Sequence, residues 1–239
     1  KQVSGYREKY PTPKIFLKND IDPNVFMHKL SAYIANDAFI CVDVGQHQMW
    51  AAQSLRLQKK QRFLSQGGMG AMGSALAMAI GSSFSHAGAR AVVIAGDGGF
   101  QLNIQELETI FHHRLAVKII LINNVCYGMV RQFQEQYFNS RYQSTVIGYS
   151  SPSFLRVASA YKIAAKSVSI SSKVTQALDW LFANNGPALL EVKIPAKIKV
   201  LPKLSVNRPI EDQEPLLSDS EMKENMLIKM IPRQDKHGR

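Results

Sequence analysis

The sequence predicts an α/β domain with a doubly wound, mostly parallel sheet and helices on both faces. Two observations favour this fold class. Short apolar runs alternate with helical patterns through most of the 239 residues, which is the order of elements in βαβ proteins. The apolar runs are also continuous rather than alternately apolar and polar, and strands of that kind are buried on both faces of a parallel sheet.

The expected elements follow one another at short intervals. Asp22 and Pro23 suit the N-cap and first turn of a helix over residues 23–34. Buried strands are expected over residues 39–45, 91–97 and 116–124, and further strands over residues 163–168 and 188–194. Further helices are expected over residues 70–84 and 102–113, directly after residue 124, and near residues 152–160 and 171–184.

The chain is expected to contain one folded domain over residues 15–195. Residues 1–14 resemble a linker from a missing N-terminal part, and the first residue is Lys1 rather than Met, so a fragment of a longer polypeptide is expected. Residues 196–239 are polar and contain several prolines, and we expect them to form an irregular C-terminal tail.

Composition excludes some classes of function. The chain carries 29 Lys and Arg against 18 Asp and Glu, but the basic residues are scattered and do not alternate with aromatic residues, which disfavours nucleic-acid binding. An anionic small molecule or an acidic partner domain accounts for the charge equally well. No apolar run reaches the roughly 18 residues of a membrane helix. Cys41 and Cys126 lie in apolar runs, so buried reduced thiols in a cytoplasmic protein are expected.

Gly68, Gly70 and Gly73 have the spacing of a dinucleotide-binding loop. That motif requires a buried strand directly before the first glycine and an acidic residue about 20 positions later. The preceding segment KKQRFLSQ is too charged for a buried first strand, and the first carboxylate after Gly68 is Asp97. The sequence therefore disfavours a Rossmann fingerprint, although the glycines still allow a ligand to approach the backbone closely.

A second polar pattern lies where two predicted strands end. Gly96-Asp97-Gly98 ends one strand and Asn123-Asn124 ends the other. The carboxyl ends of parallel strands meet at the ligand-binding edge of a sheet. Carboxylate and amide oxygens suit Mg²⁺, which binds oxygen ligands shared between protein and substrate phosphates. The alternative is a strand-end Asp in a glycine turn and an Asn pair in a loop.

This pair of motifs resembles the diphosphate-binding motif of thiamine diphosphate enzymes. Four blocks in order are similar to the C-terminal diphosphate-binding domain of acetohydroxyacid (acetolactate) synthase large subunits: DVGQHQMWAAQ (43–53), SQGGMGAMG (65–73), GDGGFQLNIQELETI (96–110) and INNVCYGMVRQFQE (122–135). The resemblance covers roughly residues 15 to 195 and implies the thiamine diphosphate-binding fold.

The resemblance also implies a set of site residues. Mg²⁺ would be bound by the side chains of Asp97 and Asn124 and by the main-chain carbonyl of Cys126. Met72 would force the cofactor into its bent conformation beside Gly70, and Met129, Gln132 and Phe133 would shape the substrate pocket. The full set of expected cofactor-binding residues is Gly45, Gln46, His47, Gly70, Met72, Gly96, Asp97, Gly98, Gly99, Asn124, Tyr127, Gly128 and Met129.

The implied activity is a transferase reaction of branched-chain amino acid biosynthesis. It would decarboxylate a 2-oxo acid such as pyruvate and join the remainder to a second carbonyl compound. The family's activating glutamate lies in a pyrimidine-binding domain of the same or another chain, usually across a homodimer or homotetramer. No catalytic residue is therefore expected in this chain, which should be inactive alone, and FAD would be bound only through a missing domain.

Three alternatives stay open. Phe133 stands where the synthases usually have Trp, and Ala77 stands where they have Pro. Phe133 and the tail segment NRPIEDQEPLL allow a carboligase with a keto-sugar acceptor, whereas Ala77 is a change in the backbone of the helix. A simple 2-oxo-acid decarboxylase is the second alternative. A cofactor-binding scaffold subunit without turnover is the third.

Overall fold

The computed structural model describes residues 2–10, 19–85 and 88–231. The chain divides into two compact units, Lys1–Lys199 and Val200–Arg239. The first unit contains the sheet and all the expected site residues. No helix within the described ranges is long and apolar enough to cross a bilayer.

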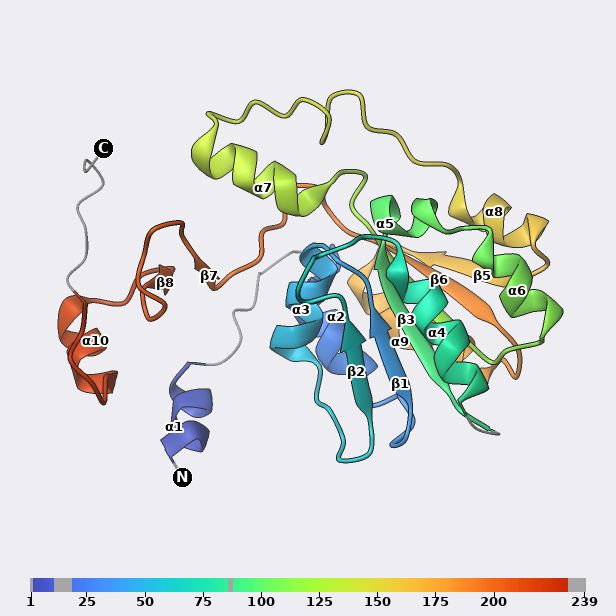
Figure 1. Cartoon of the computed structure of the whole chain (residues 1–239), viewed down its shortest axis with the longest axis horizontal. Coiled ribbons are helices and arrows are strands. Elements are labelled where there is room, and N and C mark those ends of the chain that lie inside the picture. The colour runs from blue at the N-terminus through green and yellow to red at the C-terminus, as the bar shows by residue number, and fades with distance from the viewer. Residues whose placement is uncertain (1, 11–18, 86–87, 232–239) are drawn as a thin grey trace. The chain divides into compact units, whose positions relative to one another are not determined.

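The first unit is built on a six-stranded parallel sheet in the order β2-β1-β3-β4-β6-β5 (Figure 1). The strands are β1 (Phe39–Val42), β2 (Arg62–Ser65), β3 (Ala91–Gly96), β4 (Lys118–Asn123), β5 (Ala164–Val168) and β6 (Ala188–Lys193). Every residue of β3 and β4 is buried, as expected for central strands covered on both faces. The predicted fold class is confirmed.

Helices cover both faces of this sheet. The helices of the unit after α1 (Gln2–Lys9) are α2 (Pro23–Leu30), α3 (Gln46–Ser54), α4 (Ser74–Phe84), α5 (Asp97–Leu102), α6 (Glu106–His112), α7 (Gly128–Tyr137), α8 (Phe154–Ala160) and α9 (Val174–Ala183), of which α7 extends away from the sheet (Figure 1). One face packs on α4, α6 and α8 through alternate strand residues such as Val93 and Leu121. Helices α2, α3 and α9 contact one another or the strands on the other face (Figure 1). Asp22 caps α2 as predicted, accepting a hydrogen bond from the Val25 N–H at 3.0 Å.

One strand was wrongly rejected from the sequence. Arg62–Ser65 within KKQRFLSQ forms β2, which pairs in parallel with β1. An edge strand has one neighbour and a partly exposed surface, so charged residues are tolerated there. Because β2 is a partly exposed edge strand and not a buried one, the argument that no buried strand precedes Gly68 still holds. The distance to the first carboxylate still disfavours that fingerprint.

Other boundaries also differ from those predicted. Helix α2 ends at Leu30, and the helix expected over 70–84 begins only at Ser74, after Gly73 with φ +91°. The helix expected over 102–113 is replaced by α5 and α6, and α3 was not expected. The N-terminal segment expected as a linker contains helix α1 (Gln2–Lys9), while residues 11–14 lie outside the described ranges.

The second unit contains more regular structure than the expected irregular tail. Strands β7 (Lys203–Leu204) and β8 (Gln213–Glu214) pair antiparallel. Helix α10 (Asp219–Asn225) is capped by Ser218, which accepts a hydrogen bond from the Glu221 N–H at 3.2 Å. The regular structure of the second unit thus consists of one short strand pair and one capped helix.

The two cysteines are free and buried, as predicted. Burial raises the pKa of the Cys41 and Cys126 thiols to about 11. Both therefore stay protonated near neutral pH, and neither has the exposed thiolate that a reactive cysteine requires.

Truncating the sheet core should cost much of the stability of this unit. Leu121 on β4 is fully buried, so Leu121→Ala should lower the free energy of unfolding by roughly 2–5 kcal/mol through lost burial and a cavity. Urea unfolding measures this. Leu57 is half exposed, so the control Leu57→Ala should change stability by less than about 0.5 kcal/mol. Equal effects of the two changes would contradict the assigned core.

Candidate cofactor-binding site

The expected site residues lie at the carboxyl ends of three neighbouring strands. The parallel register pairs Val42 of β1 with Ile94 of β3, and Gly96 of β3 with Ile122 of β4. The segments that follow β1, β3 and β4 therefore leave the sheet along one edge. In the sheet, β1 and β3 are neighbours, but the strand that follows β1 in the chain lies on the other side of β1, and the strand that follows β3 lies on the other side of β3. This reversal of strand order is a topological switch point, where open α/β sheets bind ligands.

A cavity at this edge is lined by most of the expected residues. Its lining includes Gly45, Gln46, His47, Met72, Gly96, Asp97, Gly98, Gly99, Asn124, Cys126, Tyr127, Gly128 and Met129. Three expected residues do not line it: Gly70 and Phe133 are exposed, and the buried side chain of Gln132 contacts Gln46. The lining also contains apolar residues that the sequence did not single out, Val44, Trp50, Ile122 and Val130.

In the orientation that the Asn124 amide has in the structure, three oxygens face one another in this cavity. The side-chain oxygen of Asn124 lies 3.2 Å from Oδ1 of Asp97 and 2.8 Å from the carbonyl oxygen of Cys126. Adjacent oxygens around an octahedral Mg²⁺ are about 2.9 Å apart, given metal–oxygen distances of about 2.0–2.1 Å. The described residues contain no cluster of three His, Cys, Asp or Glu side chains. A cation here would thus be held by one carboxylate, one amide and one main-chain oxygen, a set that fits a hard ion.

The two asparagines at the end of β4 have different contacts. Asn123 donates to Oε1 of Glu191 at 2.7 Å and accepts from the Val125 N–H at 3.0 Å. Val125 has φ +52°, an uncommon conformation for a β-branched residue. Asn123 thereby stabilises the turn that carries Asn124 and Cys126.

Asp97 is held by a tyrosine that the sequence did not single out. The Tyr149 hydroxyl donates to Oδ2 of Asp97 at 2.6 Å, and its ring packs edge-on against Tyr127. Burial raises the pKa of the Asp97 carboxyl to about 6, and the hydrogen bond from Tyr149 opposes this rise. Tyr149 lies in the irregular segment between α7 and α8, where no strand-end or helix pattern indicates its position.

Asp43 connects the glycine-rich loop to the end of β1. Its carboxylate accepts from the Gly73 N–H at 2.8 and 3.0 Å and from the Val44 N–H at 2.9 Å. A Cβ at Gly99 would collide with this carboxylate, and a Cβ at Gly98 would lie 2.5 Å from the Tyr127 ring. The first turn of α5 therefore lies close to both groups, and only glycines fit there.

His47 is buried against the backbone of two glycines. A Cβ at Gly45 or Gly96 would lie 2.8 or 2.9 Å from its ring. Burial lowers the pKa of His47 to about 4, and a hydrogen bond with the Asp43 backbone opposes this. The ring is thus neutral near pH 7, and its Nε2 has no hydrogen-bond partner among the described residues. A buried polar atom of this kind lining a cavity fits a ligand that completes its hydrogen bonding.

Comparisons with known proteins agree on one family. Residues 43–192 match the model for the thiamine pyrophosphate enzyme, C-terminal TPP binding domain. The acetolactate synthase large subunit of Pyropia yezoensis is 36% identical over 193 residues, which cover 81% of this chain and 32% of that protein. The acetolactate synthase isozyme 2 large subunit of Escherichia coli (strain K12) is 38% identical over 170 residues, which cover 71% of this chain and 31% of that protein.

A solved structure has the same fold. The Rhodococcus jostii RHA1 thiamine diphosphate-dependent 4-hydroxybenzoylformate decarboxylase superposes with a TM-score of 0.67 at 20% identity, covering 77% of this chain and 34% of that one. The chain thus spans about a third of the length of the relatives it matches.

The packing at Gly99 predicts a specific loss of stability. In Gly99→Ala the new methyl should displace the Asp43 carboxylate from the Gly73 N–H, leaving a buried charge short of donors at a cost of about 1–3 kcal/mol. Gly81→Ala in α4 is the matched control, because a Cβ there has no described atom within 4 Å and should be neutral or stabilising. Urea unfolding of both variants tests this, and equal stability would contradict it.

The buried histidine predicts acid sensitivity. Unfolded His47 has an ordinary pKa of 6.5, and folding lowers it to about 4, so its contribution is fully present above pH 6.5 and is lost as pH falls towards 4. The loss should be on the order of 3 kcal/mol, seen in urea unfolding of the cofactor-free chain. His47→Gln should flatten this part of the profile, whereas the exposed His28→Gln should not. A profile unchanged by His47→Gln would argue against this burial.

Proposed function

We propose a function from one premise: the chain belongs to the thiamine pyrophosphate enzyme family, as a C-terminal TPP-binding domain. On this proposal it holds thiamine diphosphate and Mg²⁺ in an acetolactate synthase-like transferase. That enzyme would decarboxylate a 2-oxo acid and join the remainder to a second carbonyl compound. The substrates and the assembly belong to the proposal, because the chain spans about a third of its relatives.

The oxygen cluster carries the metal part of the proposal. Asp97 Oδ1, Asn124 Oδ1 and the Cys126 carbonyl oxygen would each take one position around Mg²⁺. Three facing acceptors repel one another unless a cation or a donor lies between them. Mg²⁺ commonly keeps its other positions for phosphate oxygens and water, which suits a cofactor with a diphosphate group.

The surrounding residues suit the diphosphate group itself. The neutral His47 ring uses its one N–H on the Asp43 backbone, so its unpartnered Nε2 can accept a hydrogen bond from a water or a ligand group in the cavity. Gly98 and Gly99 leave their backbone free of a Cβ that would hold a phosphate away. Met72 lines the cavity and is 37% exposed, so it can contact a cofactor that extends outward from the sheet edge. The bound cofactor would supply the electron sink for loss of carbon dioxide, and these residues would orient it.

Exposed apolar residues around the cavity support the proposal that another domain covers it. Met72, Val125, Val130 and Phe133 are large and at least a third exposed, which is typical of a surface that another domain covers. We propose that this domain is the pyrimidine-binding domain with the activating glutamate, in a homodimer or homotetramer. A cytoplasmic location stays a prediction.

The metal assignment predicts the effect of removing one carboxylate. Asp97→Ala should reduce Mg²⁺-dependent binding of thiamine diphosphate by more than the roughly 10–100-fold that changes outside the ligand set cost. Calorimetry with and without Mg²⁺ measures this. Asp37→Ala, at an exposed carboxylate, is the control for charge and should bind normally. Unchanged affinity in Asp97→Ala would exclude this metal site.

Reconstitution with a pyrimidine-binding domain tests the reaction. Pyruvate should then be converted to a carboligation product such as acetolactate. Free aldehyde as the sole product would identify a decarboxylase instead. Cofactor binding without decarboxylation would indicate a scaffold subunit.

A further inference from the structure

We propose that Gln46 is a positioning residue that holds the Asn124 side chain with its oxygen towards the metal position. This inference rests on the metal site of the proposed function. In this inference the main-chain carbonyl of Ile198, which follows β6 in the chain, determines which end of the Gln46 amide faces Asn124. The chain Ile198–Gln46–Asn124, with Gln132 beside it, is called the amide relay below.

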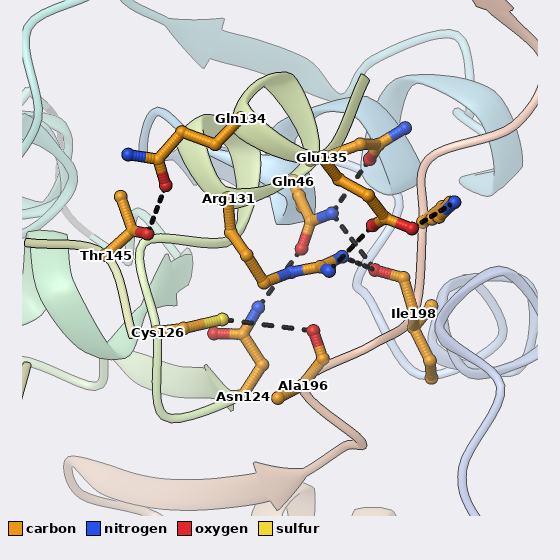
Figure 2. Close-up of polar contacts among 11 residues, drawn as sticks. Gln46, Asn124, Cys126, Arg131, Gln134, Glu135, Thr145, Ala196 and Ile198 are labelled. Carbon is orange, nitrogen blue, oxygen red and sulfur yellow. Dashed lines mark hydrogen bonds and ion pairs between the residues drawn. The ribbon is translucent and has the colours of Figure 1, made fainter. Parts of the chain in front are cut away.

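The amide relay is buried and continuous (Figure 2). Nε2 of Gln46 donates to the Ile198 carbonyl oxygen at 3.1 Å and to Oε1 of Gln132 at 3.0 Å. At the other end of the same amide, Oε1 of Gln46 accepts from Nδ2 of Asn124 at 3.1 Å. All four residues are less than a tenth exposed, so water does not readily substitute for these contacts.

The direction of each amide follows from the backbone. A main-chain carbonyl can only accept a hydrogen bond, so Gln46 must present its NH₂ group to Ile198. Its oxygen must then face Asn124, and Asn124 must present its own NH₂ group to Gln46. The oxygen of Asn124 is thereby left facing Asp97 and Cys126.

The reversed Asn124 amide would close the metal site. In that orientation its NH₂ group would donate to Oδ1 of Asp97 at 3.2 Å and to the Cys126 carbonyl at 2.8 Å. Those hydrogen bonds satisfy the acceptors without a cation, so the reversed form competes with metal binding. It would, however, place the Asn124 oxygen 3.1 Å from the oxygen of Gln46. The amide relay therefore disfavours the closed form.

The Ile198 carbonyl is itself anchored to α7. Nη2 of Arg131 also donates to it, at 3.4 Å. Glu135 pairs with Arg131 at 3.0 Å and with Lys199 at 2.7 Å, so ion pairs flank the carbonyl on both segments (Figure 2). The hydrogen bond and the ion pairs thus fix the position of the Ile198 carbonyl relative to Gln46.

Gly128 provides the space that the amide relay occupies. A Cβ there would collide with Oε1 of Gln46 and lie 2.5 Å from Nδ2 of Asn124. The first residue of α7 is therefore a glycine for a steric reason that concerns these two side chains.

The test compares one substitution in two backgrounds. Gln46→Leu should weaken metal binding by roughly 10–100-fold, the usual cost of losing a partner that orients a ligand. In the Asn124→Asp background the same substitution should cost less than about threefold, because a carboxylate presents an oxygen in either orientation. The probe is Mn²⁺ in the presence of thiamine diphosphate, with free Mn²⁺ followed by electron paramagnetic resonance and folding followed by urea unfolding.

The outcomes separate this inference from the proposed function. No Mn²⁺ binding by the unaltered chain would overturn the metal site, and the amide relay with it. Normal Mn²⁺ binding by Gln46→Leu, or an equal loss in both backgrounds, would overturn the amide relay alone. If Gln46→Leu does not fold, the unbranched Gln46→Met removes the same amide and should show the same dependence on background.

Discussion

The site depends on one electrostatic constraint, which is that three acceptor oxygens are held facing one another at the edge of a parallel sheet. Neighbouring strands β3 and β4 end in Asp97 and Asn124, and the turn at Val125 brings the Cys126 carbonyl to the same point. Such an arrangement is unfavourable without a positive charge. The protein maintains it with hydrogen bonds that each fix one oxygen: Tyr149 for Asp97, Asn123 for the turn, and Gln46 for Asn124.

Close packing is the second requirement of this edge. The glycines at positions 98, 99 and 128 lie against an aromatic ring, a carboxylate and two amides. Each absent Cβ lets a neighbouring side chain lie closer to the backbone than any other residue would allow. The glycine-rich loop has a related role, because Gly73 is the N–H partner of Asp43. These glycines therefore set distances between neighbouring elements.

The sequence predicted the fold class because the central strands are uniformly apolar, and it placed Asp97 and Asn124 together because parallel strands share one edge. It missed β2 because an edge strand is only half covered and can be as charged as a loop. It missed Tyr149 because that residue approaches Asp97 from an irregular segment far along the chain. It placed Gln46 among the expected cofactor-binding residues but could not give the direction of its amide, because a motif gives residue order whereas that direction depends on acceptors as distant as Ile198.

The carbonyl of Ile198 has a consequence for where this domain ends. A boundary drawn after β6, at Lys193, would keep all six strands and the three oxygens proposed to bind the ion. It would nevertheless remove the Ile198 carbonyl, which determines the direction of the Gln46 and Asn124 amides. A cut placed by secondary structure alone would thus lose polar contacts that the sheet edge uses, and these contacts continue through the ion pair of Lys199 with Glu135.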